Sequence, residues 1–543
     1  MILEEMTTLD IKFGETEGKR EFSTQENLLN MFFKDEYQRY IESFLNGDKR
    51  YIYGLKGTGK SSLLKYLENK AVKKNIKTMY ISYKDFREEA DVINSFKDEL
   101  KNTEDKDMYS LTFWRWYILS LVSNEFLSES SYNPKNLIYY SKVKFFKVLS
   151  KVLDLMTEFS YGKEDNIINV KLGNQNNTLV KWENTTADRI RELENSIKKN
   201  LSEKAIIFID ELELSTLSSS YEMDSILIKN LIKATRKINN LSSNLHVVLA
   251  VRSEVINSIT ASGDEINKEL EDFGYEIEWH RRKFDIHHPL IKMFIQKIRY
   301  SMIKFIKNQN LNSNLINKVN SLSIEEIWYR WFPSKISNTS TPEFILQNTW
   351  LRPRDLSRLF RIMQNYCNQN DNTFKQRSYE EAIKKVGEDS WKEIAEELLS
   401  KYVGKDIEKI RDVFEKVQVL FLKDDFVREC KKFGFTEEDI ENILNDLYKL
   451  SAIGNHFKTV KYAKLKTIYR FFYRNDKSLY HDKAITVHKA IEKGLGLSDF
   501  KSSLLINDLT DEEKNKYGCQ NSFTDYEDEF QISIADRIRE QKF

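Results

Sequence analysis

The residues of this 543-residue chain that are best suited to chemistry form one short segment, Gly54-Leu55-Lys56-Gly57-Thr58-Gly59-Lys60-Ser61. The segment matches the pattern GxxxxGK followed by Ser or Thr, and it lies between a strand-like and a helix-like run, which is where this pattern binds phosphates. Its glycines let backbone N–H groups turn towards a phosphate, and the start of the following helix adds partial positive charge. The sequence therefore predicts an ATP site contacted by Gly54, Gly57, Thr58, Gly59, Lys60, Ser61 and Ser62.

Magnesium is the expected companion of the nucleotide. The Lys60 ammonium suits the β- and γ-phosphate oxygens, while the Ser61 hydroxyl supplies one ligand to Mg²⁺. A carboxylate from the tip of a neighbouring strand is needed to complete the coordination, and the apolar run Ala205–Ile209 ends in Asp210 and Glu211. We expect Asp210 to hold Mg²⁺, through water, and Glu211 to act as a general base on the attacking water.

Two alternatives qualify this assignment of the acids. Asp210 and Glu211 could instead cap the helix that follows the strand. Glu213, two residues beyond Glu211, could also compete with it for the attacking water. The metal candidates are Ser61 and Asp210.

Cleavage of the γ-phosphate builds negative charge, so cations are expected near it. Arg252 ends the apolar run that starts at His246, and its alternative role is a surface pair with Glu254. A second cation is expected from the helix that opens at Leu351-Arg352-Pro353-Arg354-Asp355, where Pro353 suits the first turn. Arg354 is the first choice, and the alternative is that Arg352 and Arg354 brace this helix against Asp355 and other acids. The candidate catalytic residues are Lys60, Glu211, Arg252 and Arg354.

The elements that must position these residues alternate between strand and helix. Apolar runs predict strands at 51–53, 78–83, 205–209 and 246–251, with helices at 185–200 and 221–240 between the later ones. Continuous apolar runs are typical of parallel strands covered by helices on both faces. The predicted fold class is α/β, a doubly wound parallel-sheet P-loop NTPase core with a helical insertion, an all-α lid and a C-terminal winged-helix domain.

The length and the pattern predict several domains. We expect an N-terminal arm at 1–34 laid over a neighbouring domain, a P-loop ATPase core at 35–285 with an insertion at about 85–185, and a helical lid at 286–370. A winged-helix-like domain at 371–505 and a C-terminal tail at 506–543 follow. Within the insertion, the Asn-rich segment 167–181 predicts a β-hairpin. The winged-helix order rests on a helix at 436–453, strands near 455–457 and 468–474, and a helix at 484–497.

Composition limits the partners. The 85 basic and 84 acidic residues leave a formal charge of +1, so the whole molecule has no field that attracts nucleic acid or anionic lipid. Three widely spaced cysteines without metal-ligand spacing favour a reducing compartment and no zinc site. An acidic N-terminus and the lack of a run of about 18 apolar residues predict a cytoplasmic protein with no membrane partner.

One local patch could still bind a polyanion. Between His456 and Arg474 six basic residues and no acid alternate with aromatic residues. On a winged-helix hairpin this composition could grip phosphates and stack on bases, so DNA is a possible partner of residues 456–474. The alternative is that the aromatics fill a small core and the lysines face solvent.

Taken together, GLKGTGKS, AIIFIDE, the strand ending in AVRSE, the RPRDLSRLF helix and the winged-helix order resemble the AAA+/STAND group of P-loop ATPases. Within that group, residues 35–505 are most similar to bacterial ATPases of the KAP and origin-recognition branches. The resemblance implies that Arg252 is sensor 1 and Arg354 is sensor 2. It also implies a winged helix that holds the nucleotide domain off, and a place in antiviral defence. The chain departs from the pattern in its long insertion, and only Arg281 and Arg282 are candidates for an arginine finger acting on a neighbouring subunit.

Three functions follow as hypotheses. The first is an ATP-hydrolysing switch that regulates a partner effector in bacterial antiviral defence, with self-association as a further possibility. The second is a DNA-binding ATPase that loads or remodels nucleic acid through residues 456–474. The third is a scaffold or sensor that holds nucleotide without productive turnover.

Overall fold

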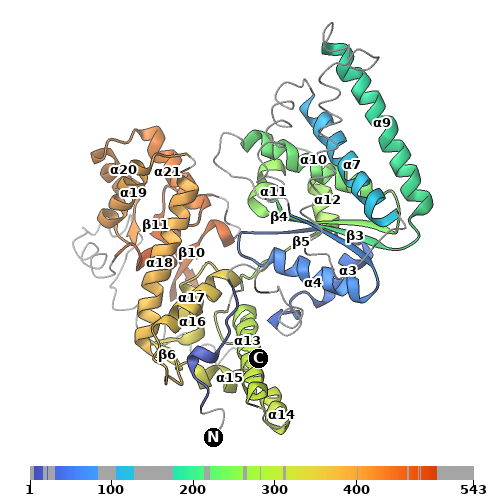
Figure 1. Ribbon diagram of the computed structural model, residues 1–543. Coiled ribbons are helices and arrows are strands. Elements are labelled where there is room, and N and C mark those ends of the chain that lie inside the picture. The colour runs from blue at the N-terminus through green and yellow to red at the C-terminus, as the bar shows by residue number, and fades with distance from the viewer. Residues whose placement is uncertain are drawn as a thin grey trace. The chain divides into compact units, whose positions relative to one another are not determined.

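The computed structural model of the chain describes these residues: 5–15, 21, 31–82, 105–127, 175–212, 221–260, 266–281, 283–309, 313–399, 401–461, 464–474, 476 and 478–497. The chain forms two compact units (Figure 1). The first, which we name the sheet unit, is Glu17–Glu278. The second, the helical unit, combines Met1–Thr16 with Trp279–Phe543, so the sheet unit is inserted into it along the chain.

A five-stranded parallel sheet forms the centre of the sheet unit, with the strand order β2-β3-β4-β1-β5. The strands are β1 (Tyr51–Gly54), β2 (Lys77–Ser82), β3 (Ala205–Leu212), β4 (Leu245–Arg252) and β5 (Gly274–Glu276). The four strands predicted from apolar runs are confirmed as β1 to β4. All eight residues of β4 are buried, as expected of a central parallel strand.

Helices cover both faces of this sheet. They are α3 (Gln38–Asn46), α4 (Lys60–Lys73), α7 (Lys106–Val122), α9 (Gln175–Asn200), α10 (Tyr221–Asn239), α11 (Ser253–Thr260) and α12 (Ile266–Phe273). Figure 1 shows α3 and α4 on one side of the sheet and α7 and α10 on the other, so the predicted doubly wound α/β core is present.

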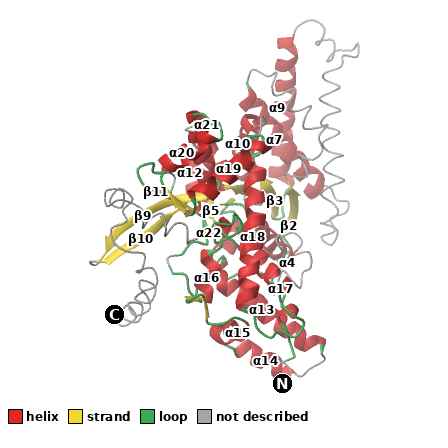
Figure 2. Ribbon diagram, turned by 90° about the vertical axis from the view of Figure 1, so that its left-hand side faces the viewer, coloured by secondary structure: helices red, strands yellow, loops and turns green. Residues whose placement is uncertain are grey.

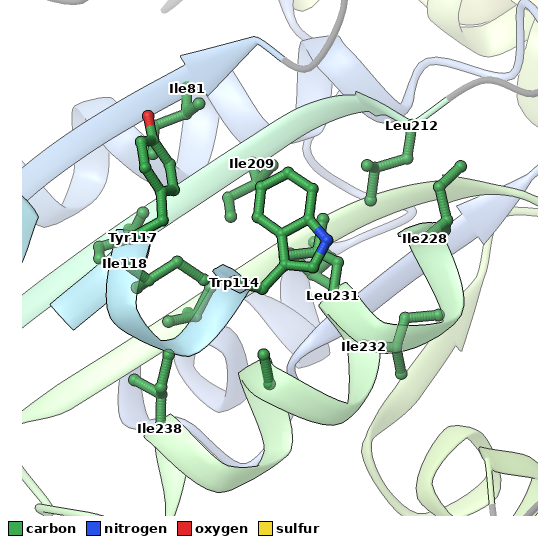
Figure 3. Close-up of a cluster of buried hydrophobic side chains, with 14 of the residues drawn as sticks. Ile81, Trp114, Tyr117, Ile118, Ile209, Leu212, Ile228, Leu231, Ile232 and Ile238 are labelled. Atoms are coloured by element: carbon green, nitrogen blue, oxygen red, sulfur yellow. The ribbon is translucent and has the colours of Figure 1, made fainter. Parts of the chain in front are cut away.

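The core between the sheet and helices α7 and α10 is mostly aliphatic (Figure 3). Trp114 of α7 packs into it, and its indole N–H donates to the carbonyl of Leu227 in α10 at 2.9 Å. Ile209 and Leu212 of β3 reach the same cluster from the sheet. This packing holds the end of β3 in place, and β3 carries Asp210.

The β-hairpin predicted for the Asn-rich segment 167–181 is wrong in the part of the segment that the structure describes. Residues 167–174 lie outside the described residues, and from Gln175 onward the backbone belongs to helix α9. Leu179, Trp182 and Ile190 occur at helical spacing that continues into the predicted helix 185–200. The helical period therefore extends further towards the N-terminus than the amide-rich composition indicated.

The first part of the helical unit after residue 279 consists of α13 (Pro289–Asn308), α14 (Ser313–Ser321), α15 (Ile324–Trp331), α16 (Thr341–Gln347), α17 (Pro353–Asn365) and α18 (Gln376–Leu398). A small antiparallel hairpin of β6 (Lys335–Ile336) and β7 (Thr339–Ser340) interrupts the helices. Pro289 and Pro353 stand in the first turns of α13 and α17, as the sequence predicted.

The C-terminal part of the helical unit is a small mixed domain. It contains α19 (Gly404–Val417), β8 (Leu420–Phe421), α20 (Lys423–Lys432), α21 (Glu437–Lys449), β9 (Ile453–Lys461), β10 (Lys464–Arg470), β11 (Ala484–Val487) and α22 (Lys489–Glu492). The strands form an antiparallel sheet in the order β10-β9-β11-β8. Figure 2 shows β9 and β10 as a long hairpin.

The helix predicted at 484–497 is wrong at its start. Residues Ala484–Val487 form strand β11, which pairs with β8 and β9, and a short helix follows only at Lys489. A four-residue apolar run is too short for its periodicity to distinguish strand from helix, and the β-branched Ile485, Thr486 and Val487 favour the strand.

Within the described residues, no helix combines the length and the apolar character that a bilayer crossing requires.

Candidate nucleotide-binding site

The glycine-rich loop lies between β1 and α4, as predicted. Gly57 and Gly59 have φ angles of 85° and 99°, in the left-handed region that glycine adopts without strain. Gly59 is the N-cap of α4, and Lys60, Ser61 and Ser62 are the first residues of that helix. The loop thus presents the start of a helix to any anion that it binds.

Two side chains close the loop on itself. The Lys60 ammonium donates to the carbonyl oxygens of Gly54 and Leu55, at 2.8 and 2.9 Å. The Thr58 hydroxyl also donates to the Leu55 carbonyl, at 2.8 Å. These contacts keep the Lys60 charge over the loop, where a phosphate would lie.

The strand register brings the other predicted residues to the same edge of the sheet. Gly54 of β1 pairs with Arg252 of β4, and Asp210 of β3 pairs with Ser82 of β2. Strand β4 separates β1 from β3, so two strand spacings, about 10 Å, lie between the end of β1 and the Asp210 strand. Arg252 ends the strand between them and is buried, as is Asp210. This edge of the sheet therefore collects a loop lysine, a buried arginine and a buried carboxylate.

A β-bulge lies at the two acids. Ile209 pairs with Leu249 and Leu212 pairs with Val251, so three steps along β3 match two steps along β4. The extra residue falls within Asp210-Glu211, and a bulge of this kind bends the strand and increases its twist. The backbone therefore departs from regular pairing at the residues predicted to bind metal and activate water.

Tyr80 is a further residue of this site that sequence reasoning missed. Its hydroxyl, on β2, donates to an Asp210 carboxylate oxygen. The Lys65 ammonium of α4 lies 3.4 Å from the centroid of the Tyr80 ring. The only sequence signal is that Tyr80 and Ser82 share a strand face by the period of two. That signal could be used only after β2 was known to pair with β3.

The lid arginines belong to the helical unit, and each has a carboxylate partner there. Arg352 binds Asp355 with its Nε at 2.7 Å and its Nη2 at 2.9 Å. Arg354 of α17 pairs with Glu393 of α18, which also pairs with Arg358. Burial by itself would raise the pKa of Glu393, but the two guanidinium groups hold that pKa below its ordinary value. These are the bracing contacts that the sequence left open as an alternative, and the nucleotide role of Arg354 stays a prediction.

The two arginine-finger candidates, Arg281 and Arg282, precede helix α13 in the chain. The Arg281 guanidinium donates to the carbonyl of the preceding His280 at 2.9 Å. Arg282 lies outside the described residues.

The chain is similar to one family model over part of its length and, weakly, to several solved structures. Residues 305–395 match a family model described as the FunZ-associated C-terminal helical domain. No curated protein matches the chain. Among solved structures, the Aeropyrum pernix ORC2 protein in ADPNP and ADP complexes is 10% identical and has a TM-score of 0.27, over 81% of this chain and 88% of that chain.

Two DnaA structures have similar sequence identities and TM-scores. The DnaA protein bound to AMPPCP and single-stranded DNA is 14% identical with a TM-score of 0.26, over 76% of this chain and 87% of that chain. AMPPCP-bound DnaA from Aquifex aeolicus is 13% identical with a TM-score of 0.24, over 78% of this chain and 98% of that chain. The parallel sheet and the loop of the chain itself define an α/β P-loop NTPase core joined to a C-terminal helical domain.

Proposed function

We propose that the chain is a Mg²⁺-dependent ATPase that works as a nucleotide-driven switch. The observation that carries this proposal is the strand register, which sets the GxxxxGKS loop and the buried Asp210 at one edge of the sheet with Arg252 between them. The donors fit the ligand, because loop amides and Lys60 suit phosphate oxygens, and a hydroxyl with a carboxylate suits Mg²⁺.

Each residue has a distinct task in this mechanism. Lys60 would exchange the carbonyls of Gly54 and Leu55 for phosphate oxygens, while Ser61 and Asp210 would hold Mg²⁺, which when bound would neutralise phosphate charge. Glu211 would take a proton from the water that attacks the γ-phosphorus as the bond to the departing ADP breaks, and Arg252 would stabilise the charge that develops on the γ-phosphate.

The switch is proposed to act through Arg354. Reaching a nucleotide would require Arg354 to exchange its pair with Glu393 for a phosphate, which links nucleotide state to the packing of α17 on α18. The change would then pass through the winged-helix-like domain to a partner effector. A place in bacterial antiviral defence is the pathway that the AAA+/STAND resemblance implies.

The test is ATP hydrolysis by Lys60→Ala, with Lys70→Ala in the last turn of the same helix as the control. We expect Lys60→Ala to lower the rate at least about 100-fold, because one preorganised donor is lost at the phosphate, and Lys70→Ala to keep it. A Lys60→Ala protein that hydrolyses ATP at the unaltered rate refutes the proposal. If the unaltered protein holds intact ATP for hours instead, the sensor without turnover is the correct function.

A second candidate function rests on the β9–β10 hairpin. In the register, Lys464 pairs with Lys461 and Lys466 pairs with Thr459. Because residues alternate between the two faces of a strand, Lys461, Lys464 and Lys466 fall on one face of the hairpin together with Arg470. Four basic positions on one face favour contact with a phosphate backbone, so we propose DNA as a ligand of this face.

Charge reversal tests the DNA proposal. Replacing Lys461, Lys464 and Lys466 with Glu should abolish salt-sensitive DNA binding. The matched control replaces Lys405, Lys416 and Lys449, which are exposed lysines of the same domain. Equal loss in both triple variants, or no DNA retained by the unaltered protein at low salt, rejects this function.

A further inference from the structure

Residues 5–15, the described start of the arm predicted at 1–34, pack within the helical unit before the chain enters the sheet unit, and they are called the arm below. Four of its side chains, those of Met6, Thr8, Ile11 and Phe13, are at most 2% exposed. Between them lie exposed residues such as Leu9 and Lys12. A short segment that buries selected side chains and exposes the others has the pattern of a peptide bound in a groove.

Phe13 is the anchor of this segment. Its ring stacks on that of Phe360 in α17, with centroids 4.7 Å apart, and lies 5.8 Å from the ring of Phe374. Phe294 of α13 lies on a further side, with its ring centroid at 6.3 Å. Phe13 thus fills a pocket whose walls, Phe294, Phe360 and Phe374, all lie in the second half of the chain.

Hydrogen bonds hold the arm mainly by its backbone. The carbonyl of Phe13 accepts from the buried Lys297 ammonium at 3.2 Å and from the Ser357 hydroxyl at 3.3 Å. The backbone N–H of Lys12 donates to the Ser301 hydroxyl at 2.9 Å.

The Gln364 side-chain amide extends this grip along the arm. It donates to the carbonyls of Thr8 at 2.8 Å and Ile11 at 2.9 Å. The Thr8 N–H donates to the Asp371 carbonyl at 2.9 Å, and Glu15 pairs with Arg361 at 2.6 Å. The groove therefore recognises a peptide with a phenylalanine, an apolar residue two positions before it, and an acid two positions after it.

We propose that this groove also binds the arm of a second copy of the chain, and that arm exchange is how copies associate. The contacts described join residues 5–15 to residues after 279, so the same set forms whichever copy supplies the arm. Exchange of an identical segment preserves every contact of the closed form, which makes it a low-cost route to an assembly.

Cross-linking between two differently tagged, co-expressed full-length chains tests the exchange. One chain carries Glu15→Cys and the other Arg361→Cys, at two partly exposed positions that form an ion pair in the structure. A short bis-maleimide should then yield a covalent dimer with both tags. Adding Phe13→Ala, or the milder Ile11→Ala, to the Glu15→Cys chain should lower the dimer yield at least tenfold.

Controls separate exchange from chance collision. The parent chain shows the background of the natural cysteines, and Val403→Cys, an exposed position of the helical unit outside the groove, replaces Arg361→Cys in a second pairing. A double variant with both cysteines in one chain reports docking within that chain. If it cross-links within itself while the mixed pair gives no dimer above the Val403→Cys control, exchange is refuted. If neither cross-links, the arm does not occupy the groove and the proposal also fails.

Discussion

Different contacts position the key residues of the sheet unit and those of the helical unit. In the sheet unit, the loop after β1, Arg252 at the end of β4 and Asp210 near the end of β3 meet at one sheet edge, because the register of neighbouring strands brings them together. In the helical unit, Phe13 from the start of the chain packs into the aromatic cluster around Phe360. One unit is organised by local apolar runs and the other depends on a distant segment. Replacing a key residue of one unit should therefore impair that unit alone: nucleotide hydrolysis for the sheet unit, and stability for the helical unit.

The largest effect is expected at the sheet edge. Asp210→Asn keeps the shape of the side chain and an acceptor for Tyr80 but removes the charge that we assign to Mg²⁺. Hydrolysis should fall at least about 100-fold, since metal binding supplies several kcal/mol of charge stabilisation. The measurement is ATPase rate against Mg²⁺ concentration, with Asp188→Asn on the exposed surface of α9 as control. An unchanged Mg²⁺ response would remove Asp210 from the site.

The complementary change acts on the helical unit. Phe13→Ala should lower the free energy of unfolding of this unit by about 3 kcal/mol, because it empties an aromatic pocket. Leu9→Ala, at a position of the same arm that is 44% exposed, should change it little. Denaturant unfolding measures both. Nucleotide binding by the Phe13→Ala protein should persist below the unfolding transition, and its loss there would show that the two units do not fail separately.

Acid should weaken the helical unit through His288, the N-cap of α13. Burial, aided by the nearby Arg281 charge, lowers the pKa of His288 to about 4, from 6.5 in the unfolded chain. A histidine that is neutral when folded contributes its full stability above pH 6.5 and loses it as the pH falls towards 4. Between pH 7 and pH 5 the loss is about 2 kcal/mol.

A pair of adjacent variants isolates this histidine. His288→Asn retains a capping side chain but does not titrate, so the difference in unfolding free energy between pH 7 and pH 5 should shrink by about 2 kcal/mol. His287→Asn, whose side chain is 61% exposed, should leave the difference unchanged. Equal pH dependence in both variants would contradict the assignment.

The smallest expected effect belongs to Tyr80. Tyr80→Phe removes the hydroxyl that donates to Asp210. The lost hydrogen bond, which orients that carboxylate, should lower the free energy of Mg²⁺ binding by about 1 kcal/mol. The expected result is a several-fold higher Mg²⁺ concentration for half-maximal hydrolysis, with the maximal rate nearly kept. Tyr66→Phe, a buried tyrosine of α4 that stacks on Phe32, is the matched control. A shift of equal size in both variants would assign the effect to packing.

Sequence patterns predicted the sheet unit well because its signals are local. The runs at Tyr51 and Ala205 each predicted a strand, and the loop pattern predicted the turn between β1 and α4. The bulge at Asp210 and the contact of Tyr80 could not be predicted, since both depend on which strands are neighbours. Strand β11 was missed because its apolar run is too short to have a readable period.

The helical unit was less predictable for a related reason. The pairing of Arg354 with Glu393 joins residues of two different helices, and several acids of similar spacing were available in the sequence. The groove for Phe13 is built from α13, α17 and residue 374, and no periodicity links these to the start of the chain. Long-range pairs of this kind are decided by packing, not by local preference.

The position of Phe13 has a consequence for synthesis on the ribosome. Phe360 is added 347 residues after Phe13, and at the 5–20 residues per second of protein synthesis the interval is roughly 15–70 s. Throughout that interval the arm's apolar side chains have no groove to enter, while the sheet unit is completed. On one messenger RNA, several nascent chains on neighbouring ribosomes would carry undocked arms when the first of them completes its groove. That groove would then lie near the arms of other chains as well as its own.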